Sequence, residues 1–511
     1  MATTYKTTIK LQIRRFKEFW GSFRRSKRGL FGIAILVVYI MVALVAPLLS
    51  SNDPVFDDYV AADFAVPAWF KNLSGGEKLN ENQVLVEKSG FPTPATLFNE
   101  WNFTTSTNED AEVTLRYHLS VGNGSAAIVF KRKDPRTLAG RVEAYLTREF
   151  FWPYDPPPRF NCNITVYASR EVEYANARVF MTIRQVGETP SYSVFWSEKI
   201  ENVTTEGIKP SPRDHPPVLD SYDSSFKVKI GNETWADPAK IVFSEPAKYV
   251  YEVRVLFIDE NPETVGMLGE AAVYVDDLNA RFYGAAYGLL GTDFRGRDIF
   301  AQFVHGARIS LFVGLLSAFL SVVIGLIVGI VSGYVGKIVD DVLMRFADML
   351  LVLPGLPLLI ILIAVLGTSL WNIIFIIGVL GWMGFARTVR SQTLSLKERP
   401  FVEAAKAVGA GRFHIILKHI LPNVVSLIYV SLALSVPTAI TLEAALSFLG
   451  LFDPSVMSWG RMLRDVQANY GAEKLWWIIP PGISIALVSL SFILLGYALD
   501  EILNPKLRRR R

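Results

Sequence analysis

The sequence is poor in cysteine, in charge and in the short motifs typical of enzymes. Its single cysteine, Cys162, excludes an internal disulfide, so the 511-residue chain is not a disulfide-stapled secreted domain. The net charge of +4 is no signature of nucleic-acid binding. The five histidines are scattered, and the spacings of zinc sites, serine hydrolases and phosphate-binding loops are missing. We therefore expect no catalysis, metal or cofactor in this chain.

Hydrophobic residues are abundant instead, at 51% of the chain, and they gather in long uncharged runs. A helix needs about 20 apolar residues to cross a hydrocarbon core of about 30 Å. Residues 30–50 satisfy this requirement, and the run is too long for the apolar core of a cleaved signal peptide. Later runs predict five more membrane spans, at 309–335, 342–367, 371–390, 422–450 and 477–499.

Charged residues set the orientation of these six predicted spans. The segment 1–29 carries nine Lys or Arg and one Glu, the loop 387–421 is basic, and the chain ends in four arginines. Because basic loops stay in the cytoplasm, both termini and this loop are predicted to be cytoplasmic. The spans themselves are predicted to lie in a plasma membrane. Residues 51–290 hold 34 acidic against 23 basic residues. We therefore expect 51–285 to be an insertion outside the cell, followed by a membrane core over 286–511.

The insertion alternates between apolar and polar residues, as in 113–119 and 249–258, with turn residues between such runs. This pattern predicts an all-β, sandwich-like domain of short antiparallel strands over about 100–265. Asn-x-Ser/Thr sequons also cluster here, which predicts glycosylation in an archaeon or a eukaryote. Polar strands and turns rich in Asn, Ser and Thr are the alternative explanation. The sequons begin at Asn72, Asn102, Asn123, Asn163, Asn202 and Asn232.

Two features within the predicted spans indicate how the helices pack. Gly325, Gly329 and Gly333 share one helix face, where small residues let two backbones approach closely, and we expect tight packing within the bundle. Glu443 is ionisable and lies within a span, which is costly. We interpret it as a hydrogen-bonding anchor near the outer end of its helix, and the alternative is that it lines a transport path. Pro354 is predicted to bend the third span.

Charged residues also lie close to the inner ends of the spans. Asp348 is expected to pair locally with Arg345. Arg387 and Arg390 are expected to support the cytoplasmic face, and contact with lipid phosphates of the inner leaflet is the alternative.

The cytoplasmic loop 396–422 is the segment most indicative of function. It is predicted to form a short alanine-rich helix, a glycine turn and a second helix that is stopped by Pro422. Its small residues and its basic face suit docking into a groove of a partner protein. The alternative is an amphipathic helix that lies on the inner leaflet.

Glu403-Ala404-Ala405, Gly409 and Leu421-Pro422 resemble the coupling loop of permease subunits in bacterial and archaeal ABC importers. Other segments are similar to the second permease of the dipeptide/oligopeptide branch. They are 290–298, 344–345 with Asp348 and Pro354, 448–451, 459–463 and 504–506. The resemblance covers 285–511 almost continuously and 1–50 loosely, and it does not account for the insertion.

This resemblance implies an α-helical membrane protein with the six transmembrane helices of the type I importer fold. It implies a second, homologous permease, two ATPase subunits that bind ATP and Mg, and an external substrate-binding lipoprotein as partners, besides membrane lipid. The residues implied to couple to the ATPases are Glu403, Ala404, Ala405, Gly409, Gly411, Leu421 and Pro422. The family motif before the second span comprises Gly291, Thr292, Asp293, Gly296, Arg297 and Asp298.

Three classes of function remain open at this stage. The resemblance implies import of di- or oligopeptides, with short oligosaccharides as the alternative, because archaeal relatives of this branch import them. A membrane-anchored binding or adhesion protein is the second class, in which the outer domain is functional and the spans are passive. An ion channel is the third class, but the spans lack a polar filter. The outer domain itself is expected either to dock the receptor or to act as a protective spacer.

Overall fold

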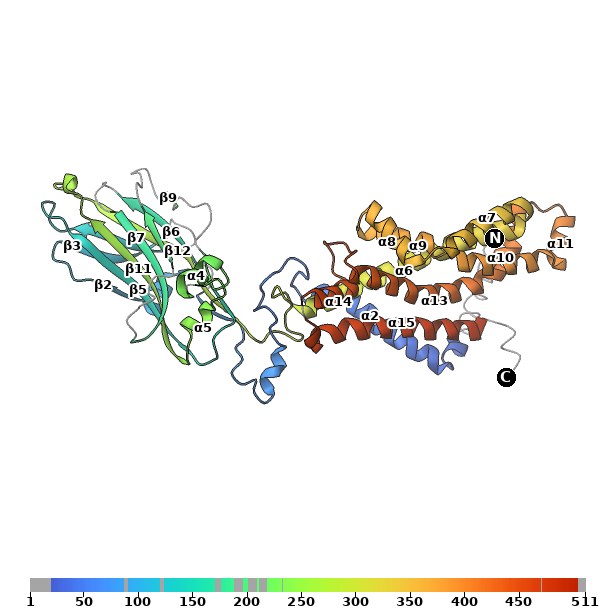
Figure 1. Cartoon of the computed structure of the whole chain (residues 1–511), viewed down its shortest axis with the longest axis horizontal. Coiled ribbons are helices and arrows are strands. Elements are labelled where there is room, and N and C mark those ends of the chain that lie inside the picture. Colours follow the sequence, from blue (N-terminus) through green and yellow to red (C-terminus); the bar gives the residue numbers. More distant parts are fainter. Residues whose placement is uncertain are drawn as a thin grey trace, which may run out of the picture. The chain divides into compact units, whose positions relative to one another are not determined.

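The computed structural model describes residues 20–86, 91–119, 124–170, 176–187, 196–200, 209–210, 218–231, 233–469 and 471–503. The chain forms two compact units (Figure 1). The helical unit comprises Met1–Asp58 and Asp298–Arg511, and the β-rich unit comprises Tyr59–Arg297.

The helical unit consists of long apolar helices joined by short loops. Among the described residues, five helical segments are long and apolar enough to cross a membrane. A sixth exists if α7 and α8, which are bent by 93° relative to one another, form one broken span. The bend lies at Pro354, which precedes the first residue of α8 and cannot donate a helical hydrogen bond. The helices are α2 (Lys27–Leu49), α6 (Ile299–Val335), α7 (Lys337–Val352), α8 (Gly355–Leu366), α9 (Leu370–Leu380), α10 (Met383–Lys397), α11 (Pro400–Ala407), α12 (Arg412–Ile415), α13 (Leu421–Phe448), α14 (Trp459–Ala468) and α15 (Leu475–Leu503).

The glycines of α6 form a close seam with α10. A Cβ atom at Gly329 would lie only 2.6 Å from the carbonyl oxygen of Ala386 and 2.7 Å from the Cβ of Val389. Gly325 and Gly333 meet α10 in the same way, one helical turn to either side. The predicted role of these glycines in close packing is therefore confirmed, because any side chain here would push the two helices apart.

Two serines continue this packing from α6 to α9. The buried hydroxyl of Ser317 donates a hydrogen bond to the carbonyl of Ile374 at 3.2 Å, and that of Ser321 donates to the carbonyl of Gly378 at 2.8 Å. Such bonds between helices satisfy hydroxyl groups that would otherwise be stranded away from water.

The described residues of the β-rich unit form two antiparallel sheets. The first has the order β10-β6-β12-β4-β3, with β1 paired to β12 and β9 to β6, and the second has the order β2-β5-β11-β7-β8. Three short α-helices, α3 (Pro94–Glu100), α4 (Ser224–Gly231) and α5 (Pro238–Val242), accompany them. The strands are β1 (Gln83–Val86), β2 (Asn102–Thr105), β3 (Ala111–His118), β4 (Ser125–Arg132), β5 (Gly140–Trp152), β6 (Arg159–Arg170), β7 (Asn176–Gln185), β8 (Trp196–Ile200), β9 (Lys209–Pro210), β10 (Val218–Asp220), β11 (Ala247–Asp259) and β12 (Glu270–Tyr283).

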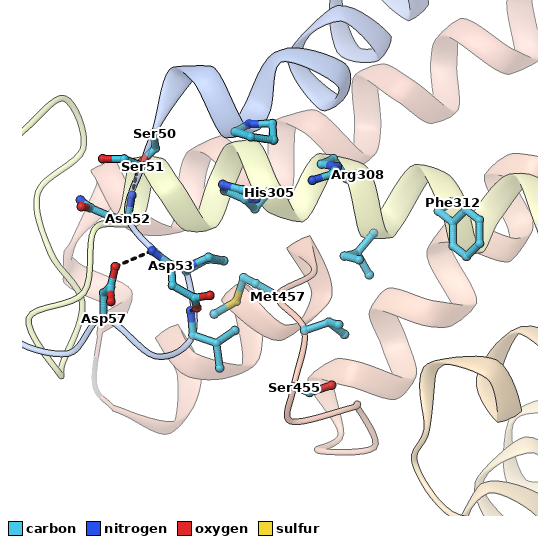
Figure 2. Close-up of a pocket in the computed structure, with 15 residues that line it drawn as sticks. Ser50, Ser51, Asn52, Asp53, Asp57, His305, Arg308, Phe312, Ser455 and Met457 are labelled. Atoms are coloured by element: carbon cyan, nitrogen blue, oxygen red, sulfur yellow. Dashed lines mark hydrogen bonds between the residues drawn. The ribbon is translucent and has the colours of Figure 1, made fainter.

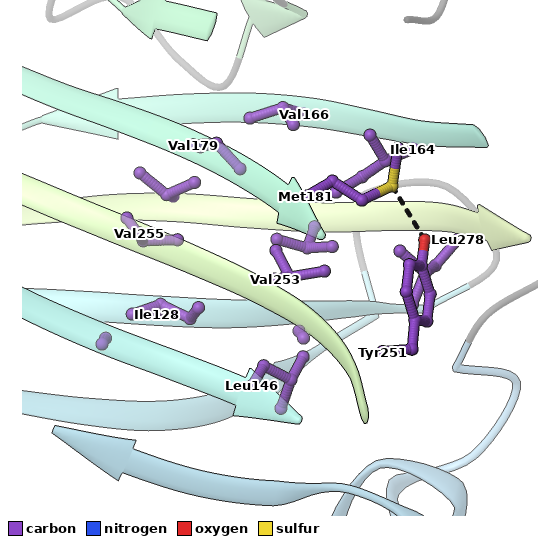
Figure 3. Packing of buried hydrophobic residues seen from close by; sticks show 14 of the residues in the cluster. Ile128, Leu146, Ile164, Val166, Val179, Met181, Tyr251, Val253, Val255 and Leu278 are labelled. Carbon is purple, nitrogen blue, oxygen red and sulfur yellow. Dashed lines mark hydrogen bonds between the residues drawn. The ribbon is translucent and has the colours of Figure 1, made fainter. Parts of the chain in front are cut away.

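Both sheets contribute side chains to one hydrophobic core. Figure 3 shows Val179 and Val255 of the second sheet together with Val166 and Ile128 of the first. In β5, for example, Val142, Ala144 and Leu146 are buried and the residues between them are not, which is the period-two pattern that the sequence predicts.

A buried ion pair lies at one edge of this core. The guanidinium of Arg132 bonds to both carboxylate oxygens of Asp259, and it also donates to the carbonyl and the hydroxyl of Thr264 at 2.7 Å each. Both charged side chains are fully buried. Their mutual bonds replace the water that they lose on folding, so each charge depends on its partner.

Candidate functional site

The loop 396–422 forms helices around a glycine turn. Helix α11 ends at Ala407, and Gly409 follows with a φ of +84°, a conformation that favours glycine. The amide of Ala410 then donates to the carbonyl of Ala405 at 3.0 Å, which closes the helix end. The predicted helix, turn and helix are thus present between 400 and 415.

The predicted end of the second helix at Pro422 is wrong. Helix α12 continues through a π-helical turn, Ile416–Ile420, directly into α13, and Pro422 lies in the first turn of α13. The amide hydrogen that Pro422 lacks would have bonded to a carbonyl of this π-helical turn, where the regular ladder of helical hydrogen bonds is already interrupted. The loop is therefore continuous with a long helix of the unit.

The inner side of the loop is buried in the helical unit. Val402, Ile415 and Ile420 have at most 1% of their surface exposed, and they pack into one cluster with side chains of α6, α10 and α13. Ala405 is partly buried against the same cluster. The packing fixes the loop to these three helices, so a displacement of the loop would be transmitted to them.

The outer side of the loop presents an unusual set of exposed groups. Glu403 and Ala404 are exposed, as are both turn glycines, Gly409 and Gly411. Glu403 forms no ion pair within the part of the chain that the structure describes. Four large apolar side chains near these groups have 42–89% of their surface exposed. These four residues, which we call the loop surface, are Phe401, Val408, Phe413 and Leu417.

Ion pairs tie α10 to α7 behind this loop. Arg390 binds Asp340 through two hydrogen bonds, at 2.5 and 2.6 Å. Arg387 pairs with Asp348. The expected pair between Asp348 and Arg345 is therefore wrong, since Arg345 instead bonds to Asp341 one turn before it, at 2.9 Å. Asp348 reaches across to the neighbouring helix rather than along its own.

Glu443 lies near the C-terminal end of α13 and is buried. Its Oε1 accepts hydrogen bonds from the hydroxyls of Ser447 and Ser458, each at 2.7 Å. Ser458 is also the N-cap of α14, where its hydroxyl accepts a bond from the amide of Arg461. The carboxyl group therefore joins α13 to the start of α14, which is the geometry of an anchor.

Trp459 packs inside the helical unit, a role that the sequence patterns did not predict. Its side chain is fully buried, and its indole donates to the carbonyl of Phe303 at 3.1 Å. Its backbone amide donates to the hydroxyl of Ser310 at 3.2 Å. The available signal was Ser458, a good N-cap residue directly before an amphipathic segment.

The motif at 290–298 builds a turn and starts a helix. A Cβ at Gly291 would lie 2.2 Å from the carbonyl oxygen of Ala65, so this position requires glycine. The buried carboxylate of Asp293 accepts from the guanidinium of Arg297 and from the amide of the same residue. Thr292 is buried too, and Gly296 has a φ of +68°. These residues hold the chain in shape and expose no reactive group.

Asp298 caps the long helix α6 by accepting a hydrogen bond from the amide of Phe300 at 2.8 Å. Its other oxygen accepts a bond from the side chain of Asn52 at 3.3 Å. Burial raises the pKa of this carboxyl above its ordinary value. The cap fixes the first turn of α6 to the segment that follows α2.

The predicted sequons differ in accessibility. Asn72 and Asn102 are exposed. Asn163 lies within β6, between β10 and β12, and its side-chain oxygen is buried. Three further sequons, at Asn123, Asn202 and Asn232, lie outside the described residues.

Two families of known membrane proteins match segments of this chain that lie almost entirely in the helical unit. The family described as the inner membrane component of binding-protein-dependent transport systems matches residues 325–509. The N-terminal transmembrane domain of oligopeptide transport permease C matches residues 14–67. The unmatched residues between them include the whole β-rich unit except its first few residues.

Two curated relatives have the same permease type. The dipeptide transport system permease protein DppC of Bacillus subtilis is 43% identical over 220 residues, which are 43% of this chain and 69% of that protein. The oligopeptide transport system permease protein OppC of Haemophilus influenzae is 44% identical over 221 residues, or 43% of this chain and 71% of that protein.

Solved structures offer little for the β-rich unit. A carbohydrate-binding module of the β-sandwich superfamily covers 38% of this chain and 62% of its own, at 12% identity and a TM-score of 0.23, which is too low to assign a fold or a ligand. The helical unit alone therefore decides the family. The chain belongs to the binding-protein-dependent transport family of inner-membrane components, as a permease of the DppC/OppC type.

Proposed function

We propose that this chain is the second permease subunit of an ATP-driven importer for di- or oligopeptides. Peptides are favoured over short oligosaccharides because the curated relatives are named as dipeptide and oligopeptide permeases. The observation that supports the transport role is the loop 396–422, whose inner side packs against three helices while its outer side is exposed. A passive membrane anchor has no need of such a loop.

The proposed partner of the loop surface is a cytoplasmic ATPase subunit, which binds ATP and Mg itself. Phe401, Val408 and Phe413 would enter an apolar groove on that subunit, while Glu403 makes a charged contact. Ala404 and Gly409 allow the two surfaces to approach closely. When the two ATPases close on ATP, the loop moves with them and shifts the helices to which its inner side is packed. The chain itself contributes no catalytic group.

The proposed topology has six membrane spans, with α7 and α8 together as the third. Both termini and the loop surface are then cytoplasmic, and the β-rich unit, which we propose to be a β-sandwich, lies outside. The path for substrate forms between this chain and a second, homologous permease, and an external lipoprotein delivers the peptide. The large apolar side chains exposed on α7 and α8, such as Val352 and Val365, support contact with that second permease or with lipid.

We also propose that glycosylation, if the host performs it, uses Asn72 and Asn102 but not Asn163. The first two side chains are open to an enzyme, whereas Asn163 is held within a sheet. Mass spectrometry of tryptic glycopeptides from native membranes tests this assignment. A glycan found on Asn163 would show that modification precedes folding of the sheet.

Charge reversal at Glu403 tests the coupling role. Glu403→Lys should reduce two quantities by about tenfold: the amount of ATPase that co-purifies with the permease, and the uptake of a radiolabelled dipeptide. The reason is that the new lysine would face a positive charge of the ATPase in a buried interface, and this repulsion should weaken binding by more than about 1.4 kcal/mol. The matched control is Glu473→Lys, an exposed glutamate outside the loop surface, which should change neither.

Unchanged co-purification and uptake in Glu403→Lys would contradict the proposal and favour the anchored binding protein. Uptake of a short oligosaccharide in place of dipeptide would keep the permease role and replace only the substrate.

A further inference from the structure

A cavity of about 590 Å³ lies at the outer ends of α2 and α6, wholly within the helical unit (Figure 2). Three segments line it: the end of α2 with the turn over 50–57, the part of α6 around His305 and Arg308, and the loop before α14. This volume is within the range of small-molecule sites. The transport role proposed above assigns no task to it.

The cavity has opposite charges on opposing walls. His305 and Arg308 lie about one turn apart on α6, and Asp53 and Asp57 lie on the turn across from them (Figure 2). Neither His305 nor Arg308 has a hydrogen bond or ion pair within the described part of the chain, and the Nε2 atom of His305 is buried. The exposed guanidinium of Arg308 is therefore open to an anion on this wall.

The acidic wall is held in place by its own backbone. One oxygen of Asp53 accepts from the amides of Val55 and Phe56 at 2.8 and 2.9 Å. One oxygen of Asp57 accepts from the amide of Asp53 at 2.6 Å. Each carboxylate therefore has a second oxygen without a partner among the described residues. These oxygens suit an ammonium group, because carboxylates bind cationic donors more strongly than neutral ones.

The remaining wall is apolar and continues along α6. Ile309 and Phe312 line the cavity directly after Arg308. Residues 309–336 contain no Asp, Glu, Lys, Arg or His, so Arg308 stands at the outer end of the membrane-spanning part of α6. The ring of Phe312 contacts the ring of Trp371 edge to face at 5.9 Å, and Trp371 is 63% exposed. Exposed Trp beside a basic residue is typical of the headgroup level of a bilayer.

We propose that this cavity binds the headgroup of a zwitterionic phospholipid from the outer leaflet. Arg308 and His305 bind the phosphate, Asp53 and Asp57 bind the ammonium group, and Phe312 contacts the upper acyl chain. A dipeptide also carries one anionic and one cationic end. It would leave unfilled the apolar wall that runs from the cavity toward the hydrocarbon, and for this reason the lipid is favoured.

Native mass spectrometry of the purified complex, with its partner subunits, tests this site. The complex is equilibrated with an equal mixture of phosphatidylethanolamine and phosphatidylglycerol that have identical acyl chains. Arg308→Gln should reduce the retained phosphatidylethanolamine about tenfold, as loss of one charge-assisted contact predicts. Arg464→Gln on α14, outside the cavity, is the matched control and should change nothing. The double variant Asp53→Asn/Asp57→Asn should abolish the preference for phosphatidylethanolamine but keep phosphatidylglycerol bound.

Equal retention of the two lipids by the unaltered complex would overturn the proposal, and so would unchanged retention in Arg308→Gln. The proposal would also be overturned if a dipeptide displaced the lipid from the unaltered complex but not from Arg308→Gln. The cavity would then be assigned to the transported substrate. Because Arg308 is exposed, the variant is expected to fold, and gel filtration of the complex checks this.

Discussion

The two units of this chain are stabilised in opposite ways. The β-rich unit buries large side chains such as Trp152 and Phe243 in one core shared by two sheets, and it pairs Arg132 with Asp259 inside. The helical unit packs α6 on α10 through glycines and leaves apolar residues such as Val352 almost bare. One unit therefore encloses its apolar side chains, while the other leaves many of them exposed, as expected of a multi-pass membrane protein.

The largest expected effect tests the self-sufficiency of the β-rich unit. Arg132→Met leaves Asp259 as an unpaired buried charge, which should destabilise that unit by about 3–5 kcal/mol. Limited proteolysis of the full chain over a temperature series measures this loss. The control is Arg116→Met, which breaks an exposed pair with Glu270 and should cost little. If the loop 396–422 became sensitive to protease at the same temperature as the β-rich unit, the two units would not be independent.

The next effect addresses the glycine seam of the helical unit. Gly329→Ala introduces a Cβ atom that meets backbone and side chain of α10 below 3 Å, so overpacking should cost about 1–3 kcal/mol. Gly482→Ala on α15 is the matched control, because no atom lies within 4 Å of its added Cβ. Thermal unfolding of detergent-solubilised protein should show a lower midpoint for the first variant alone. Equal midpoints would mean that α6 and α10 do not pack as closely as described.

A smaller effect is expected at the junction of α13 and α14. Ser458→Ala removes the N-cap of α14 and one of the two hydrogen bonds to Glu443, which should cost about 1–2 kcal/mol. Ser455→Ala, at an exposed serine in the preceding loop, serves as the control. The same unfolding assay applies, and a result in which Ser455→Ala is the more harmful variant would contradict the anchoring role of Glu443.

The smallest effect concerns the surface of the β-rich unit and depends on pH. The hydrogen bonds from Arg116 hold the pKa of Glu270 below its ordinary value. Its contribution to stability is therefore present above about pH 4.5 and is lost as the pH falls through the lowered pKa. Glu270→Gln should destabilise the unit by less than about 1 kcal/mol at pH 7, because the pair is exposed. At pH 3 the difference from the unaltered chain should shrink, and growth of the difference at low pH would contradict this assignment.

Sequence patterns predicted the helical unit better than the β-rich one. Uncharged runs located the membrane-spanning helices, and the spacing of Gly325, Gly329 and Gly333 predicted a close helix contact, because both signals are local and repeat with the helix. The bend at Pro354 followed from proline chemistry alone. The pairing of Asp348 with Arg387 could not be predicted, because it depends on which helices become neighbours. The pair of Arg345 with Asp341 lies four residues apart on one helix, a spacing that sequence alone can indicate.

The β-rich unit shows the same limit. Alternation predicted strands over 113–119 and 249–258, and β3 and β11 lie there. The order of the strands and the pairing of Arg132 with Asp259 depend on contacts between residues more than 100 positions apart. Periodicity carries no information on such pairs. The cavity near the N-terminal end of α6 was missed for the same reason, since its walls come from three distant segments.

The two ends of the β-rich unit run side by side as backbone. The amide of Tyr59 donates to the carbonyl of Arg295, that of Val66 donates to Ala285, and that of Ala68 donates to Gly288, each at 2.9 Å. The chain therefore leaves and re-enters the unit at nearly the same point, so everything between 69 and 283 could be exchanged for a short turn without altering the distance between α2 and α6. Such a cassette can be gained or lost during evolution as a single event, and it offers a place at which to graft a foreign domain onto a transporter.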